Sequence, residues 1–129
     1  MKKILFLLFC VLTPIISGCN KSDSKAEDSL AGTTWTATYG SDTPIVLDFV
    51  SSTNVEFFPS DQFGNVKGTV SSGTYKKNGN NIEFNLVGKL DWLNSAVYTT
   101  GSISNNRMTV KWYYEGYPDN PLTEVFIKK

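Results

Sequence analysis

The chain has 129 residues, and its 12 basic and 12 acidic side chains give a formal net charge of zero at pH 7. It contains no histidine, which excludes Ser-His-Asp and Cys-His catalytic sites and histidine-ligated metal sites. The absence of a basic patch argues against nucleic-acid binding, and the length suits a single domain.

The amino terminus has the pattern of an export signal. Two lysines precede an apolar run over residues 4–16, and small residues follow it before Cys19. The run is shorter than the roughly 20 apolar residues that span a bilayer, and Pro14 would interrupt a spanning helix. We therefore expect residues 1–18 to be a cleaved signal peptide.

The tetrapeptide Ile16-Ser17-Gly18-Cys19 resembles the lipobox of bacterial lipoprotein precursors. In that family the cysteine is linked to diacylglycerol, becomes the first residue after cleavage and is N-acylated with a fatty acid such as palmitate. The resemblance implies that Cys19 is a membrane anchor. Inner-membrane lipoproteins of some Gram-negative bacteria carry Asp at the next position; Asn20 therefore implies the outer membrane, facing the periplasm or the cell surface. The alternative is an ordinary secretory signal with an incidental cysteine.

Cleavage would remove Cys10 and leave 111 residues with Cys19 as the only cysteine and a balance of 10 basic to 12 acidic side chains. No intramolecular disulfide would then be available, so the domain must be held together by its core. Residues 19–31 are expected to be the lipidated cysteine and a flexible tether, because residues 20–29 are polar, charged and free of aromatics. The folded domain is expected over residues 32–129.

From Gly32 onward, apolar and polar residues alternate with a period of two, which indicates β-strands. The predicted strands are 34–39, 45–50, 54–58, 68–76, 81–87, 96–103, 107–114 and 122–128. Tight turns at 51–53, 77–80 and 104–106 alternate with connections at 40–44, 59–67, 88–95 and 115–121, most of which are long. In an up-and-down meander, alternate connections lie at opposite ends. The sequence therefore predicts an all-β, eight-stranded antiparallel up-and-down β-barrel with its long loops at one end.

The predicted barrel interior is bulky. Its inward set is Trp35, Tyr39, Leu47, Phe49, Val55, Phe57, Ile82, Phe84, Leu86, Met108, Val110, Trp112 and Val125. Eight strands enclose a space that side chains fill or that holds one small molecule, and this set favours a packed base with a shallow recess. The facing of strands 68–76 and 96–103 stays open, because Gly73, Tyr75, Val97 and Tyr98 do not agree on one face; a β-bulge would reconcile them.

The meander resembles the lipocalin-like, or calycin-type, domains of bacterial lipoproteins. Gly32 and Trp35 approximate the Gly-x-Trp motif of their first strand, with one residue more between them. In those families the tryptophan closes the barrel floor beside a basic residue from a late strand. The resemblance implies this role for Lys128, lying over Trp35 as a cation on an aromatic face, with Arg107 as the alternative.

Aromatic residues at the loop-bearing end are the candidate ligand-binding residues. Phe63, Trp92 and Tyr117 lie in long loops and are not needed by the strand core, and Tyr39 ends the first strand at the same rim. The competing interpretation is that such residues only plug the barrel mouth.

Catalysis has little support. The loop carboxylates at 61, 91, 115 and 119 are of a kind that is ordinarily solvated, and turn formation explains Asp119 without Ca²⁺. We expect no enzyme activity, cofactor or metal. Two hypotheses remain: a monomeric, membrane-anchored lipoprotein that binds a small apolar or glycan-like ligand at its loop-bearing end, or a non-catalytic envelope structural or protein-interaction module, inhibitor-like, with a filled barrel.

Overall fold

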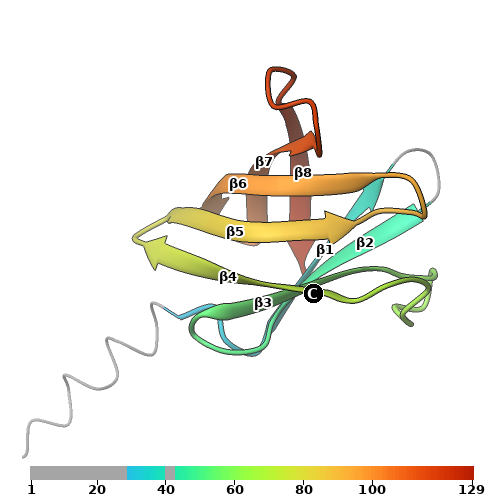
Figure 1. Cartoon of the computed structure of the whole chain (residues 1–129). Helices are drawn as coiled ribbons and strands as arrows, with labels where there is room; N and C mark the ends of the chain where they lie inside the picture. Colours follow the sequence, from blue (N-terminus) through green and yellow to red (C-terminus); the bar gives the residue numbers. More distant parts are fainter. Residues whose placement is uncertain (1–28, 40–42) are drawn as a thin grey trace, which may run out of the picture.

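The structure, a computed structural model, describes residues 29–39 and 43–129. The expected signal peptide, Cys19 and most of the tether lie outside the described residues, as do residues 40–42 of the first long loop. The strands are β1 (Thr33–Tyr39), β2 (Thr43–Phe49), β3 (Asn54–Pro59), β4 (Ser71–Asn78), β5 (Asn81–Lys89), β6 (Ser95–Ser104), β7 (Arg107–Tyr114) and β8 (Leu122–Lys128). Each strand pairs antiparallel with the next, and β8 returns to β1 (Figure 1). The predicted eight-stranded up-and-down barrel is therefore confirmed.

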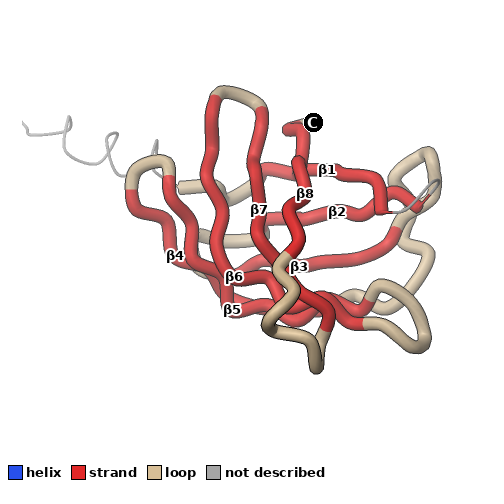
Figure 2. The backbone as a smooth tube through the Cα atoms, turned by 90° about the horizontal axis from the view of Figure 1, so that it is seen from above, coloured by secondary structure: helices blue, strands red, loops and turns tan. Residues whose placement is uncertain are grey.

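The connections divide the barrel into two unlike ends, called here the base and the mouth. The base carries the turns β2–β3, β4–β5 and β6–β7, and the mouth carries the longer β3–β4, β5–β6 and β7–β8 loops (Figures 1 and 2). Gly79 and Asn105 have φ values of 58° and 56°, the left-handed conformation that tight hairpin turns require. Glycine and asparagine adopt this conformation most readily, which explains why the chain reverses here.

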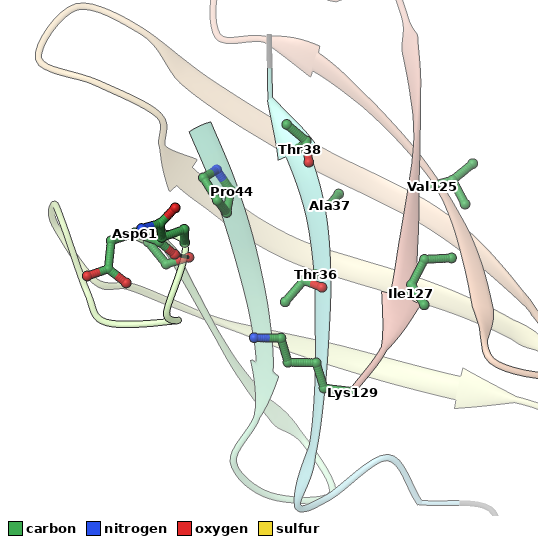
Figure 3. A pocket seen from close by; sticks show the side chains of 10 residues that line it. Thr36, Ala37, Thr38, Pro44, Asp61, Val125, Ile127 and Lys129 are labelled. Atoms are coloured by element: carbon green, nitrogen blue, oxygen red, sulfur yellow. Dashed lines mark hydrogen bonds between the residues drawn. The ribbon is translucent and has the colours of Figure 1, made fainter. Parts of the chain in front are cut away.

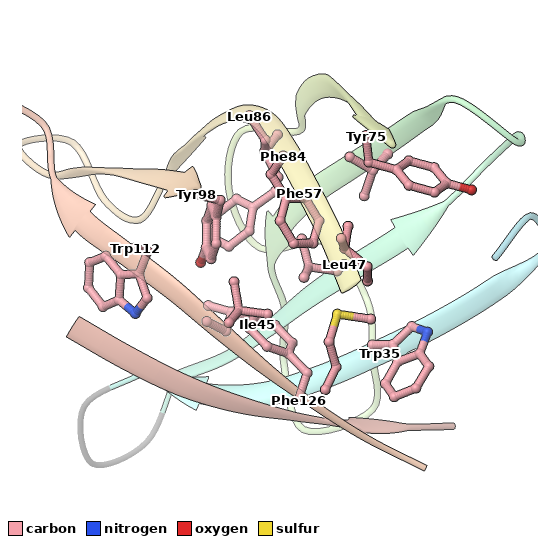
Figure 4. Close-up of a cluster of buried hydrophobic side chains, with 14 of the residues drawn as sticks. Trp35, Ile45, Leu47, Phe57, Tyr75, Phe84, Leu86, Tyr98, Trp112 and Phe126 are labelled. Carbon is pink, nitrogen blue, oxygen red and sulfur yellow. The ribbon is translucent and has the colours of Figure 1, made fainter. Parts of the chain in front are cut away.

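The interior is packed with large side chains. Eleven members of the predicted inward set are buried, and Tyr75, Tyr98 and Phe126 join them (Figure 4). The rings form a connected cluster: the centroids of Phe49 and Tyr75 lie 4.7 Å apart, and those of Phe57 and Tyr98 lie 5.4 Å apart. The side chain of Tyr39 lies outside the described residues.

Strand pairing settles the facing of β4, and a β-bulge settles that of β6. Tyr75 of β4 is buried opposite buried Phe84, so Gly73 and Tyr75 share the inner face. The register of β6 against β7 shifts between Tyr98 and Thr100, and β5 against β6 shifts between Glu83 and Leu86. A bulge moves the inward phase by one residue, so Tyr98 points inward before the shift and Gly101, opposite Val110, follows it.

The prediction that Val125 points inward is wrong. Phe126 is fully buried opposite Met108, whereas Val125 is only partly buried and lines a groove on the outer wall. Directly opposed residues share one face of a sheet, so the β7–β8 register fixes the phase of β8. The same register places Glu124 opposite buried Val110, on the inner face.

The barrel closes through a short ladder between its first and last strands. The register pairs of β1 and β8 are Trp35↔Lys128 and Thr36↔Ile127, and the Lys129 amide donates to the Thr34 carbonyl at 3.0 Å. From this contact near the base, the two strands draw apart toward the mouth (Figure 3). This region is called the β1–β8 seam below.

Candidate functional site at the barrel mouth

Two hollows lie between the loops of the mouth. The first rim hollow, of about 460 Å³, lies between the β3–β4 and β5–β6 loops and is lined by Pro59, Lys67, Gly68, Thr69, Lys89, Leu90, Asp91 and Trp92. The second rim hollow, of about 510 Å³, lies between the β5–β6 and β7–β8 loops and is lined by Leu93, Asn94, Ser95, Tyr114, Glu115 and Tyr117. Both volumes are in the range of small-molecule sites.

The β5–β6 loop separates the two hollows and contributes to both. Trp92 lines the first with its side chain 82% exposed, and Leu93 lines the second at 69%. Tyr117, 65% exposed, lines the second hollow from the β7–β8 loop. Two predicted rim residues, Trp92 and Tyr117, therefore lie in adjacent hollows.

Phe63 lies apart from these hollows, although it is 79% exposed. It follows Asp61 and Gln62, which line a groove of about 360 Å³ on the outer wall beside Thr36, Ile127 and other residues of β1, β2 and β8 (Figure 3). A Cβ added to the next residue, Gly64, would lie 3.4 Å from the Lys129 Nζ. The first half of the β3–β4 loop therefore borders the outer wall.

An aspartate holds the shape of the β5–β6 loop. The Asp91 Oδ1 accepts hydrogen bonds from the amides of Leu93 and Asn94, each at 2.7 Å, and its Oδ2 accepts one from the Asn94 Nδ2 at 2.9 Å. The Asn94 side-chain bond and these amides lower the pKa of Asp91. Trp92 is therefore presented on a loop whose backbone is internally braced.

The β3–β4 loop repeats this arrangement. The Asp61 Oδ1 accepts from the amides of Phe63 and Asn65 at 2.8 and 2.9 Å, and its Oδ2 accepts from the Asn65 Nδ2 at 2.9 Å. The bonds from Asn65 are the main cause of the lowered pKa of Asp61. A general acid at neutral pH needs a raised carboxyl pKa, so neither aspartate has the protonation behaviour of a glycosidase acid.

The barrel base holds the residues that the family resemblance singled out. Trp35 is buried and its Nε1 donates to the Thr33 Oγ1 at 3.0 Å. Lys128 is the register partner of Trp35, so the two residues share a face, whereas Arg107 precedes the inward Met108 and belongs to the opposite face. The register therefore places Lys128 better than Arg107 for a contact with Trp35.

Glu124 is the inward-facing charge that sequence reasoning missed. Burial raises the pKa of its carboxyl group, and a hydrogen bond from the Val125 amide partly offsets the effect. The sequence Leu-Thr-Glu-Val-Phe-Ile-Lys allows either phase, with Val125 and Ile127 on one face or Leu122 and Phe126 on the other. Placing the larger side chain of Phe126, and not that of Val125, in the core would have identified Glu124 as inward-facing.

The described residues contain no group of three His, Cys, Asp or Glu side chains placed to hold a metal ion. In the same part of the chain, no helix is long and apolar enough to cross a membrane.

Comparisons of the chain with protein-family models, with curated proteins and with solved structures found no match.

Proposed function

We propose that the protein is a lipid-anchored lipoprotein of the bacterial outer membrane, with a lipocalin-like barrel that binds a small, glycan-like ligand at its mouth. The observation that carries the proposal is the set of exposed apolar side chains, Trp92, Leu93 and Tyr117, on loops that border two hollows. Exposed aromatic rings beside polar groups suit sugar rings, whose C–H faces stack and whose hydroxyls form hydrogen bonds.

The packed interior supports a binding site at the rim and argues against one inside a deep calyx. Phe57, Tyr98 and Phe126 fill the centre of the barrel, with exposed fractions of 0–1%. Both rim hollows mix apolar side chains with amide, hydroxyl or charged groups. A wholly apolar ligand would bury these polar groups without offering them hydrogen bonds, which costs binding free energy.

The membrane anchor rests on the Cys19 motif, and the position of the amino terminus is consistent with it. The described chain enters β1 at the base, where the Gly32 amide donates to the Phe49 carbonyl at 2.7 Å. A tether from Cys19 would therefore lead to the base and leave the mouth facing away from the membrane. Metabolic labelling with a palmitate analogue tests the anchor: the wild-type chain should be labelled and sediment with membranes, and Cys19→Ala should do neither.

The ligand proposal is tested by titrating the full chain, purified in detergent, with a panel of neutral and acidic oligosaccharides and fatty acids. We expect saturable quenching of tryptophan fluorescence by an oligosaccharide, and calorimetry should show that Trp92→Ala abolishes the binding. Because Trp92 is 82% exposed, its removal should change Tm by no more than a few degrees. A large loss of stability would instead make Trp92 a plug of the mouth.

Phe63→Ala is the matched control, because it removes an equally exposed aromatic side chain away from both rim hollows. The alternative function, a non-catalytic envelope interaction module, is favoured by the outer-wall groove beside the β1–β8 seam. A module of that kind would bind no member of the panel, and Phe63→Ala, rather than Trp92→Ala, would weaken its association with a protein partner.

A further inference from the structure

The first rim hollow differs from the second in the charges that line it. Lys67 and Lys89 approach it from the β3–β4 loop and from the end of β5, and Trp92 lies in the same lining. The second rim hollow contains no basic residue in its lining and one acidic residue, Glu115. Only the first therefore presents cationic groups beside an exposed aromatic ring.

The acidic groups near these lysines are already hydrogen-bonded within their own loops. Asp91, which lines the hollow, accepts three hydrogen bonds from Leu93 and Asn94. Asp61 accepts three from Phe63 and Asn65, and Lys67 contributes only the weakest of the causes that lower its pKa. The Asp91 carboxylate stays ionised at neutral pH because its hydrogen bonds lower its pKa, so the lining holds two cationic side chains against one anionic side chain.

The backbones that carry the two lysines are fixed. The Lys67 amide donates to the Pro59 carbonyl at 2.9 Å, and the Lys89 amide donates to the Ser71 Oγ at 3.1 Å. Gly68 lets the loop approach Pro59 closely, since a Cβ there would lie 3.3 Å from the proline ring. The lysine stems thus start from defined points, while their ammonium groups stay adjustable.

We infer that the first rim hollow binds an anionic carbohydrate, a sugar ring bearing a carboxylate or sulfate, with the ring against Trp92 and the anion between Lys67 and Lys89. A single sugar ring carries both an apolar face and, when acidic, a fixed negative charge, which matches the two kinds of group in this lining. This inference rests on the proposed function and names its ligand class.

The experiment compares three probes by isothermal titration calorimetry with the full chain in detergent. An oligogalacturonate supplies carboxylates, its methyl ester is the same sugar without charge, and a sulfated galactan oligosaccharide supplies sulfates. We expect at least one acidic probe to bind at least tenfold more tightly than the neutral ester, with an affinity that falls as salt is raised from 50 to 200 mM. The acidic probe that binds more tightly identifies the anion.

Variants assign the effect to the hollow. Lys67→Gln combined with Lys89→Gln should weaken the acidic probe about tenfold or more and leave the methyl ester unchanged, whereas Trp92→Ala should weaken both. Lys76→Gln combined with Lys111→Gln, an equal loss of two charges on the exposed faces of β4 and β7, is the control and should change neither. Circular dichroism of each variant establishes that the barrel is intact.

Equal binding of acid and ester, insensitive to the lysine changes, would overturn the inference and leave a neutral-glycan function standing. Absence of binding by all three probes and by the wider oligosaccharide panel would overturn the proposed function and this inference with it.

Discussion

At the scale of single residues, Glu124 is a carboxylate on the inner face of a packed barrel. Burial raises its pKa above the ordinary value of 4.5, so its charged form is less stable in the folded state than in the unfolded state. The folded state therefore binds the proton more tightly, and Glu124 destabilises the barrel as pH rises through this range. Below both pKa values this penalty disappears.

We therefore expect Glu124→Gln to raise Tm at pH 7.5 and to give no advantage at pH 3.5. The increase should be only about a few degrees, because solvent screens this partly exposed group. Thermal unfolding of both proteins at the two pH values measures the difference. An equal advantage at both would attribute the gain to packing and not to charge.

Gly88 is a position where the surrounding side chains leave no room for a Cβ atom. A Cβ at this position would lie 2.5 Å from the Phe57 Cδ1, and that ring is fully buried against Tyr98. We expect Gly88→Ala to lower the free energy of unfolding by about 1–3 kcal/mol, measured by urea denaturation. In a double-mutant cycle, Phe57→Leu should reduce the cost of Gly88→Ala; strictly additive losses would exclude the clash as its cause.

At the scale of elements, the β5–β6 loop depends on one carboxylate. Asp91→Ala removes three hydrogen bonds from an exposed loop without touching the core, so we expect faster amide exchange at Leu93 and Asn94 with Tm nearly unchanged. Hydrogen exchange followed by NMR measures this. Asp119→Ala, in the exposed β7–β8 loop, is the control. Unchanged exchange in Asp91→Ala would show that the loop holds its shape by backbone contacts alone.

The pH dependence of this loop has the opposite sign to that of Glu124. The pKa of Asp91 lies below its ordinary value of 3.8, so the ionised carboxylate is more stable in the folded loop than in the unfolded chain. Its stabilisation of the loop is therefore fully present above the unfolded pKa and is lost as pH falls through the folded pKa. Protection of the Leu93 and Asn94 amides should therefore persist at pH 5 and fall only in more acidic solution.

At the scale of the whole molecule, the β1–β8 ladder has the fewest register pairs of any two neighbouring strands in the barrel. Thr36 and Ile127 are register partners there and both line the outer-wall groove. Cα atoms of opposed residues lie at about 4.5–5.5 Å in antiparallel ladders, a separation that suits a disulfide.

We expect the oxidised Thr36→Cys, Ile127→Cys variant to gain about 2–4 kcal/mol in the free energy of unfolding, because the bridge closes nearly the whole domain into one loop. Chemical denaturation with and without a reductant measures the gain. A reduced form as stable as the oxidised one would show that the seam does not limit stability.

Much of this architecture could be predicted from sequence because it depends on local signals. The period-two alternation of β5, from Ile82 to Leu86, and the Asn-Gly turn at Gly79 specify strands and reversals directly. The phase of β8 could not be predicted this way, since its own residues permit both faces and the choice is made by its pairing with β7.

The candidate site was predictable in part for the same reason. Trp92 and Tyr117 stand out as loop aromatics from sequence alone, but the path of a loop does not follow from its composition. The sequence therefore could not show that Phe63 lies outside the linings of both rim hollows. Nor does any local feature connect Lys67 with Lys89, which the fold brings into one lining.

The pairing of Trp35 with Lys128 also determines when the barrel can close during folding. β1 receives its second neighbour only when β8 is available, so any sheet that forms before then has two unpaired edges. Closure must join segments at opposite ends of the domain, which makes it a slow step of high contact order. A nascent chain is most exposed to mispairing with another copy during this interval.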